Sequence, residues 1–317
     1  MKHRILRGAI VVAVVLLGLC LSGVLTIHPF MSDLLEKESG TFRVMSLNLN
    51  GLDGDGETPF SEDCFCEVAK QLDPDVLSLQ ELSLTQYESC KEMLDSLFDY
   101  CEFSGRYMAV CSKMPITMHK RYKGKGQIDT TDFSDANFEE MKILRASLPF
   151  FTADLTFPDG RSLMVFNCHL RSSAYSLARR SMGEEETWMS GLPKYWREYK
   201  LGRRIRDYEA DNIRNVLDTL RTGAMGAVMA GDFNDFSGSY CLRRICRNRD
   251  LEGSIRLSDA WLKRGNGFGF TYDGWHLRLR LDHILYTTST LRLRNVRVLD
   301  TDLSDHRILI ADFEVKE

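Results

Sequence analysis

Residues 227–235 read AVMAGDFND, and this stretch gives the clearest view of how the chain folds. Four apolar residues predict a short buried strand, and Asp232 and Asn234 follow it two residues apart. Because alternate side chains of an extended chain point to the same face, both polar groups are expected on one side of the strand end. A turn with no other role is the simpler interpretation of this stretch alone.

The same arrangement recurs along the chain, which makes it informative. Each of several apolar runs ends in, or begins with, a carboxylate, an amide or an imidazole. One such residue would indicate only a cap or a turn, but five or six predict one site at a common rim of the sheets. These residues are Asn48 and Asn50 after residues 42–49, Gln80 and Glu81 after residues 76–79, Asn167 and His169 closing residues 162–167, Asp282 in residues 281–286, and Asp305 and His306 before residues 308–313.

The remaining pattern predicts a mixed α/β fold in one domain. Further strands are expected at residues 107–111 and 151–156, and helical spacing appears at residues 64–71, 85–97 and 199–220. Pro158-Asp159-Gly160 predicts a hairpin turn. No second linker, repeat or low-complexity block interrupts residues 41–317, so we expect a single domain there, preceded by a polar tether at residues 28–40.

The N-terminus predicts a membrane anchor. Residues 9–27 carry no charge, and at about 1.5 Å per residue a helix of this length approaches the ~30 Å of a bilayer core. A cleaved signal peptide is the alternative, and a lipoprotein signal at Cys20 is disfavoured by the bulky Leu19 before it. Lys2, Arg4 and Arg7 precede the span, which predicts a cytoplasmic N-terminus and a domain on the non-cytoplasmic side.

Charge and cysteine content narrow the class of protein. The 317 residues hold 41 basic and 45 acidic side chains, and without the three cations before the span 38 basic side chains face 45 acidic ones, a net charge of −7. That balance argues against an unassisted polyanion binder and suits a protein that recruits divalent cations. There are nine cysteines, whose pairing stays open, and Cys111 and Cys168 lie in apolar runs typical of small buried side chains.

The motifs LNLNG, DVLSLQE, SKMPI, NCHL, GDFND, RLDHIL and SDHRILI occur in this order between residues 41 and 315. Together they resemble the endonuclease/exonuclease/phosphatase superfamily, the DNase I-like phosphoesterases. The resemblance implies an α/β (α+β) fold, a four-layer sandwich of two mainly antiparallel sheets flanked by helices. It also implies Mg²⁺ or Mn²⁺ and hydrolysis of a phosphodiester or phosphomonoester by in-line attack of water.

The resemblance also implies roles for individual residues. Glu81, Asn48 and Asp305 would hold the metal, and Asp232 would orient or deprotonate the attacking water with Asn234 fixing its geometry. Asp282 and His306 would form a carboxylate–imidazole pair, and Asn167 and His169 would contact phosphoryl oxygens. Asn50 departs from the acidic residue of several nuclease members, which argues against a second tightly held metal.

Several alternatives stay open. The substrate class could be a nucleic acid, a phospholipid headgroup or a phosphorylated metabolite, no protein partner is evident, and a catalytically silent scaffold on the same fold is the alternative function. Arg171 could grip a second phosphate or form a surface ion pair. The aromatic-rich interval between His169 and Asp232 could be a substrate flap or a helical excursion, and Arg243, Arg244, Arg247 and Arg249 are expected on a solvated helix face.

Overall fold

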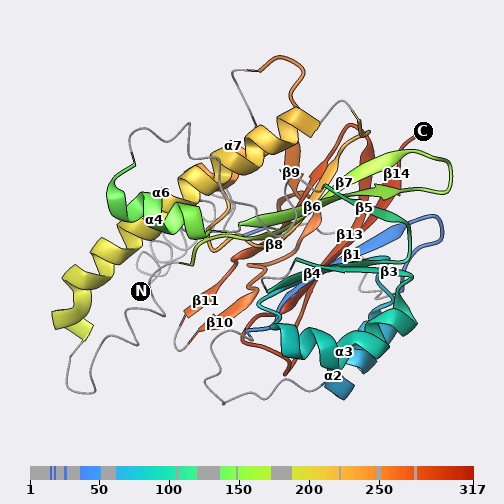
Figure 1. Ribbon diagram of the computed structural model, residues 1–317, viewed down its shortest axis with the longest axis horizontal. Coiled ribbons are helices and arrows are strands. Elements are labelled where there is room, and N and C mark those ends of the chain that lie inside the picture. The colour runs from blue at the N-terminus through green and yellow to red at the C-terminus, as the bar shows by residue number, and fades with distance from the viewer. Residues whose placement is uncertain are drawn as a thin grey trace, which may run out of the picture.

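Two six-stranded sheets pack face to face and form the centre of the protein (Figure 1). The structure is a computed structural model. It describes Val15, Gly18, Leu25, Thr26 and residues 36–50, 62–104, 107–119, 136–147, 149–172, 188–220, 223–247, 251–274 and 277–317.

Each sheet is built from strands far apart in the sequence. The strand order in the first sheet is β13 (Leu291–Leu299), β14 (Ile308–Val315), β1 (Phe42–Asn48), β2 (Val76–Gln80), β4 (Met108–Ser112) and β3 (Tyr100–Phe103). In the second sheet it is β5 (Ile116–Met118), β6 (Phe150–Thr156), β7 (Ser162–His169), β8 (Ala227–Asp232), β12 (Asp282–Thr287) and β9 (Leu257–Asp259).

Helices cover the outer faces of both sheets. Helices α2 (Glu62–Leu72) and α3 (Leu84–Leu97) pack on the first sheet, where Phe65 and Leu94 meet Leu77. Helices α6 (Trp188–Leu220) and α7 (Tyr240–Cys246) pack on the second, where Ile213 meets Phe166. Shorter elements complete the fold: α4 (Phe138–Ala146), α8 (Ala260–Arg264) and the hairpin of β10 (Tyr272–Gly274) and β11 (Leu277–Leu279).

The strand directions bring the predicted polar residues to one end of the sandwich. Among the described strands one pair in each sheet is parallel, β1 with β2 and β7 with β8, and the other pairs are antiparallel. In register, Asn48 lies opposite Gln80, and Asp232 lies between His169 and Asp282. Strands β12 and β14 start at the end where β1, β2, β7 and β8 finish.

The predicted fold class is confirmed: two mainly antiparallel sheets are flanked by helices in four layers. All eight predicted strands and the three predicted helices are present, and Gly160 adopts a positive φ of 84° in the turn between β6 and β7. The sequence interpretation missed β13 and the short elements β3, β5, β9, β10, β11, α4 and α8, whereas α7 matches the helix expected for the arginines after GDFND.

Both cysteines expected in apolar runs are buried, and one of them is paired. Cys168 is buried and unpaired among apolar neighbours, as expected. Cys111 is also buried in the core, and it forms a disulfide with Cys101 directly opposite it on β3, a pairing that the sequence left open. The register explains the pairing, since the two residues are direct cross-strand neighbours with Cα atoms 4.1 Å apart.

The predicted membrane anchor lies almost wholly outside the described residues. Of residues 9–27 the structure describes Val15 and Gly18, which are helical, and Leu25 and Thr26. Across the described parts of the chain, no helix combines the length and the apolar character that a membrane crossing needs.

Candidate active site

The strand ends hold a compact cluster of titratable side chains. Asp232 is the last residue of β8, and Gly231 before it lets the chain pass close to β7. A Cβ atom on Gly231, whose φ is +146°, would lie 1.9 Å from the carbonyl oxygen of Cys168. Glycine is therefore required for β7 and β8 to bring His169 and Asp232 side by side in register.

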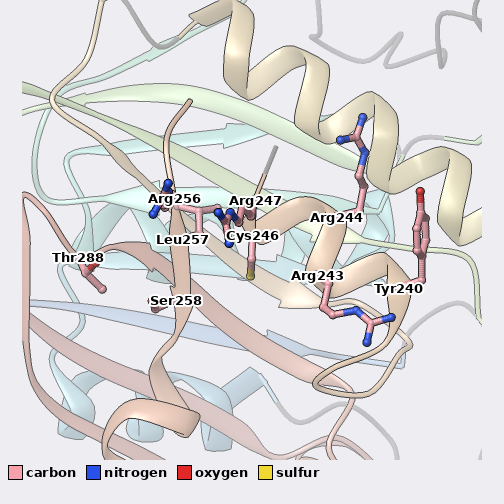
Figure 2. A pocket seen from close by; sticks show the side chains of 9 residues that line it. All are labelled: Tyr240, Arg243, Arg244, Cys246, Arg247, Arg256, Leu257, Ser258 and Thr288. Carbon is pink, nitrogen blue, oxygen red and sulfur yellow. The ribbon is translucent and has the colours of Figure 1, made fainter. Parts of the chain in front are cut away.

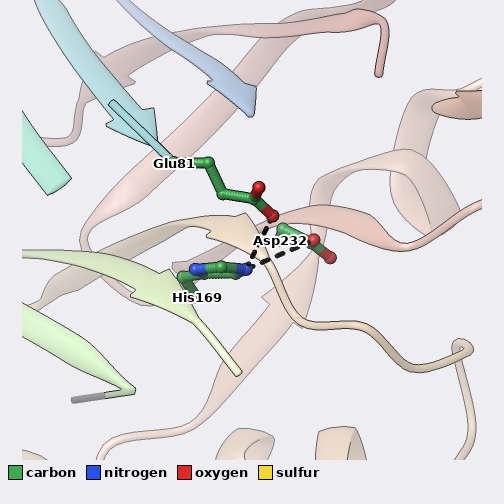
Figure 3. Close-up of side chains that lie close together, drawn as sticks. All are labelled: Glu81, His169 and Asp232. Atoms are coloured by element: carbon green, nitrogen blue, oxygen red, sulfur yellow. Dashed lines mark ion pairs between the residues drawn. The ribbon is translucent and has the colours of Figure 1, made fainter. Parts of the chain in front are cut away.

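Glu81, His169 and Asp232 converge from both sheets (Figure 3). Nε2 of His169 lies 3.2 Å from Oε1 of Glu81 and 3.9 Å from Oδ2 of Asp232. One ligand atom from each residue falls within 4.8 Å of the others, a spacing that a single metal ion could bridge. The two carboxylates make this a hard-oxygen site, to which the imidazole adds a nitrogen.

Two amides hold the Asp232 carboxylate in place. Asn234 donates its backbone N–H to Oδ1 at 2.8 Å and its Nδ2 to Oδ2 at 2.9 Å. Asn48 donates Nδ2 to Oδ2 of Asp232 at 3.1 Å and to Oε1 of Glu81 at 3.0 Å, and so links the two sheets across the site. Asn234 thus fixes the orientation of the Asp232 carboxylate.

His306 and Asp282 form the predicted carboxylate–imidazole pair. Nδ1 of His306 lies 2.8 Å from Oδ2 of Asp282, and Nε2 points toward Asp232 at 3.9 Å. Ser304 accepts the backbone N–H of His306 with its hydroxyl at 3.1 Å. The ring of Tyr272, a residue that no sequence motif pointed to, lies 4.9 Å from that of His306.

The environment separates the proton affinities of these groups. Burial favours neutral Glu81, but the hydrogen bond and charge of His169, with the Asn48 hydrogen bond, lower its pKa to about 2. Burial raises the pKa of Asp232 to about 6; His306 and His169 oppose the rise, and Asp282 adds to it. Burial opposes charge on His306, but attraction and a hydrogen bond to Asp282 raise its pKa to about 10.

Backbone strain is concentrated at the same end of the sandwich. Asn50, Glu81 and Asn234 have positive φ angles of 49°, 52° and 50°, in a region that residues other than glycine seldom adopt. Strained residues of this kind persist where surrounding contacts fix them, and they gather at functional sites.

Asn167 lies elsewhere than expected. Its side chain is fully buried between the sheets, donates to the backbone carbonyls of Leu79 and Ala109 at 2.8 Å each, and accepts from Nε2 of Gln80 at 2.7 Å. With these groups engaged, the amide has no polar atom to offer a phosphoryl oxygen. The predicted contact is therefore replaced by a structural link between the two sheets.

The other two predicted positions lie at the rim of the cluster. Asp305 is partly buried beside the site; burial raises its pKa, and the nearby Glu81 carboxylate adds to the rise. It is not part of the three-residue group of close ligand atoms found among the described residues. Asn50 donates its backbone N–H to Oδ1 of Asn48 at 2.9 Å and so helps to fix that amide.

The arginines after GDFND line a separate cavity of about 690 Å³ between α7 and β9. Arg243 and Arg247 are exposed, as expected for a solvated helix face, whereas Arg244 pairs with Asp211 of α6. Arg249 lies outside the described residues. The cavity shares no residue with the catalytic cluster (Figure 2); it is lined by Tyr240, Arg243, Arg244, Cys246, Arg247, Arg256, Leu257, Ser258 and Thr288.

The interval between His169 and Asp232 is helical over residues 188–220, which favours the helical alternative there. Trp196 on this helix is 51% exposed and meets Tyr199 edge-on at 5.7 Å. Residues 173–187 lie outside the described residues. Arg171, at the start of the interval, donates its backbone N–H to Glu209 and turns its exposed side chain into a cavity of about 290 Å³ beside Lys142.

Comparison with known proteins identifies the family. The model of the Endonuclease/Exonuclease/phosphatase family matches residues 45–306, most of the chain and all of the predicted site residues. The protein belongs to the endonuclease/exonuclease/phosphatase family. A search of curated proteins finds no match.

Several solved structures share the fold of this protein. The human Nocturnin catalytic domain with bound sulfate anion matches with a TM-score of 0.55 and 17% identity over 89% of this chain and 97% of that one. D. rerio TDP2 complexed with a single-strand DNA product matches with a TM-score of 0.55 and 16% identity, over 87% and 99%. ANGEL2, described as a 2',3'-cyclic phosphatase, matches with 0.52 and 16%, over 86% and 95%. At these identities the likeness concerns the fold.

Proposed function

We propose that the protein is a divalent-metal-dependent phosphoesterase that hydrolyses a phosphodiester or phosphomonoester by in-line attack of water. The observation that carries this proposal is the convergence of Glu81, His169, Asp232 and His306 at one end of the sandwich. Family membership adds support, as do the neighbours described with a DNA product and as a cyclic phosphatase.

The residues of the cluster fit a hard divalent cation. The partly buried Glu81 and the buried Asp232 place two carboxylates together, and the positive charge beside them comes from imidazoles. In this proposal Glu81 and Asn48 would hold Mg²⁺ or Mn²⁺, with Asp305 contributing directly or through water, and Asp232 and His169 of the three-residue group would serve proton transfer beside the ion. When bound, the metal neutralises charge on the phosphoryl oxygens and polarises the phosphorus centre.

Protein groups then supply the proton transfers. Asp232, with a pKa of about 6, is suited to accept a proton from water at neutral pH, and Asn234 holds it in line. His306, with a pKa of about 10, is an imidazolium at that pH and donates to a phosphoryl oxygen. His169 protonates the leaving oxygen as the P–O bond breaks, so that the water oxygen stays on phosphorus.

The catalytic alternative is favoured over the silent scaffold by the state of these side chains. A scaffold has no need for the buried Asp232 carboxylate, because a pKa raised to about 6 makes its charged form cost folding free energy at neutral pH. Perturbed proton affinities of this kind, aligned on one cluster, are typical of acid–base catalysis.

We also propose that residues 9–27 anchor the protein in a membrane with the domain on the non-cytoplasmic side. Residues 9–27 carry no charge, and the two residues described in their middle, Val15 and Gly18, are helical. The Cys101–Cys111 disulfide suits an oxidising compartment. Alkaline extraction and protease protection test this: the protein should stay with membranes, and its domain should be shielded from protease added to the cytoplasmic side.

The activity is tested with the full chain in detergent against bis-p-nitrophenyl phosphate, DNA, RNA and phospholipids, with Mg²⁺, Mn²⁺ or EDTA. Wild type should turn over at least one substrate only with metal, and Asp232→Asn should abolish that turnover. Asp95→Asn, which removes an exposed carboxylate on α3, is the matched control and should behave as wild type. Turnover that survives EDTA or the Asp232→Asn change would refute the proposal.

A further inference from the structure

The end of the uncharged N-terminal stretch contacts the catalytic domain. Thr26 donates its backbone N–H to the carbonyl of Gly267 at 3.0 Å and accepts the N–H of Gly267 at 2.8 Å. Its hydroxyl donates to the same carbonyl at 3.1 Å, and Thr26 is 8% exposed. If residues 9–27 cross a membrane, Gly267 therefore lies within hydrogen-bonding distance of the point where the chain leaves it.

The loop that carries Gly267 presents aromatic side chains. Phe268 and Phe270 stack with ring centroids 5.1 Å apart, and Phe268 is 39% exposed. The loop has a rigid base, because Gly265 and Gly269 sit on the buried Trp261, where any Cβ would come within 2.3 Å of its ring. Small residues on the inside of the loop thus turn its aromatic residues outward.

The surroundings of this loop have the composition of a membrane interface. Lys263 and Arg264, in the last turn of α8, are both exposed next to it. Aromatic rings placed at headgroup depth and basic residues beside them are the combination that binds an anionic lipid surface.

The same loop connects directly to the catalytic cluster. Thr271 accepts the N–H of Asp282 with its hydroxyl at 3.0 Å, and its carbonyl accepts the N–H of Arg307 at 2.7 Å. Tyr272 forms an isolated bridge with His306. Tyr272 is the fourth residue after Phe268, so the two Cα atoms are at most about 14 Å apart.

We infer that residues 265–271 lie at the lipid–water interface and hold the catalytic cluster against the headgroup layer, so that the substrate is a phospholipid of the same membrane. The inference rests on the proposed function and names its substrate class. Through its contact with Gly267, Thr26 sets the depth of the loop in the membrane, and Phe268 and Phe270 enter the interface. The bridge between Tyr272 and His306 fixes the catalytic cluster relative to the loop. A headgroup phosphate lies at the depth this arrangement requires, whereas a nucleic acid would have to approach across the membrane surface.

Contact with lipid is tested without reference to activity. The full chain is reconstituted in vesicles of phosphatidylcholine and phosphatidylserine, with p-benzoyl-phenylalanine replacing Phe268. Tyr100 is the matched control position, because it is an aromatic residue 40% exposed at the opposite end of the first sheet. Irradiation should give lipid adducts at position 268 and few at position 100. Equal yields at the two positions would overturn the inference.

Substrate class is tested with the double variant Phe268→Asp/Phe270→Asp in the same vesicles. Its turnover of the vesicle phospholipid should fall at least tenfold, with turnover of soluble bis-p-nitrophenyl phosphate unchanged. Asn266→Asp, which adds a charge to the same loop, should reduce lipid turnover less. Equal lipid turnover by wild type and the double variant overturns the inference.

The two proposals fail separately. Wild type that hydrolyses the soluble diester or DNA but no phospholipid would leave the proposed function standing and refute the membrane substrate. Wild type that hydrolyses none of these substrates with metal present would refute the proposed function itself.

Discussion

Two buried aspartate–histidine pairs lie on opposite faces of the second sheet, and their chemistry differs because of one ring nitrogen. His306 contacts Asp282 through Nδ1 at 2.8 Å, and His283 contacts Asp259 through Nδ1 at 2.9 Å. Nε2 of His283 is taken by the carbonyl of Asp235 at 3.0 Å, whereas Nε2 of His306 faces the Asp232 carboxylate at 3.9 Å. We call His306–Asp282 the open pair, because its free ring nitrogen faces the catalytic cluster and can act on a substrate. We call His283–Asp259 the closed pair, because both ring nitrogens are engaged and the pair can only stabilise the fold.

The neighbours of the two aspartates reinforce this division. Asp259 is held by Arg280 at 2.8 Å as well as by His283, and it also caps α8 by accepting the N–H of Trp261. Within the described parts of the chain Asp282 forms its ion pair with His306 and none with an arginine, and its Oδ1 is buried without a hydrogen-bond partner there. The Asp282 carboxylate, which is not paired with an arginine, keeps His306 charged. The Asp259 carboxylate, which is fully paired, keeps the contact of β9, β12 and α8 rigid.

The largest expected effect is the loss of turnover when His306 of the open pair is substituted. His306→Asn keeps a donor for Asp282 but removes the imidazolium, so turnover should fall by about 10²- to 10⁴-fold, the usual contribution of an acid–base group. Circular dichroism and thermal melting should show a folded domain. His283→Asn is the control, and it should retain turnover while losing stability. The reverse outcome, an active His306 variant, would remove His306 from the mechanism.

Breaking the closed pair should chiefly affect stability. Arg280→Met leaves the buried Asp259 without its strongest opposite charge, and removing one partner of a buried ion pair costs about 3–5 kcal/mol. Urea unfolding of the variant should show a lower midpoint with an unchanged slope. The kcat per folded molecule should stay near that of wild type. A normal midpoint would show that Arg280 is not needed to balance Asp259.

The pairs should weaken at opposite ends of the pH scale. Burial opposes charge on Asp259, but Arg280 and His283 lower its pKa below the ~3.9 of the unfolded chain, so its stabilisation is present above pH ~4 and lost in acid. The pKa of His306, raised to about 10, exceeds the unfolded value of ~6.5, so its stabilisation is complete below pH ~6.5 and is lost as pH rises through 10.

Variants measured across pH test that assignment. Asp259→Asn should lower stability at neutral pH and flatten its loss below pH ~4, and Asp282→Asn should flatten the loss above pH ~7. Thermal melting at intervals of pH gives both limbs in one experiment. An Asp259→Asn protein with the wild-type acid limb would assign acid unfolding to other carboxylates, Glu81 among them.

The sequence predicts the long buried strands well and the short or half-buried strands poorly. Apolar runs locate the eight main strands, because burial on both faces leaves a continuous signal, as in residues 227–230. Strand β13 was missed although LRLRNVRVL alternates in the way a half-buried strand does, and three-residue strands such as β5 are too short to leave a period.

The site is less predictable, because partners and not residue types decide roles. Asp282-His283 and Asp305-His306 are the same dipeptide in the sequence, yet His306 pairs with Asp282, and His283 pairs with Asp259 on the other face. Adjacent residues on a strand point to opposite faces, so the side chains of Asp282 and His283 cannot pair with each other. The engagement of Asn167 with Leu79 and Ala109, and the contact of Thr26 with Gly267, join segments that no local pattern connects.

The smallest expected effect concerns the residue that joins the two pairs. The hydroxyl of Thr271 accepts the N–H groups of Leu281 and Asp282 at 3.1 and 3.0 Å, directly beside Arg280 of the closed pair. Thr271→Val keeps the shape and removes this acceptor, so it should cost about 1–3 kcal/mol, the penalty for buried N–H groups left without a partner. Thr271→Ser restores the hydroxyl and should recover most of that loss.

Because Thr271 positions Asp282 without touching substrate, the kcat of Thr271→Val should fall less than that of His306→Asn. The pH at which stability is lost on the alkaline side should shift as well. If Thr271→Val lowers stability but leaves the pH of the alkaline stability loss unchanged, Thr271 only supports the fold. The open pair would then be positioned by contacts from β14.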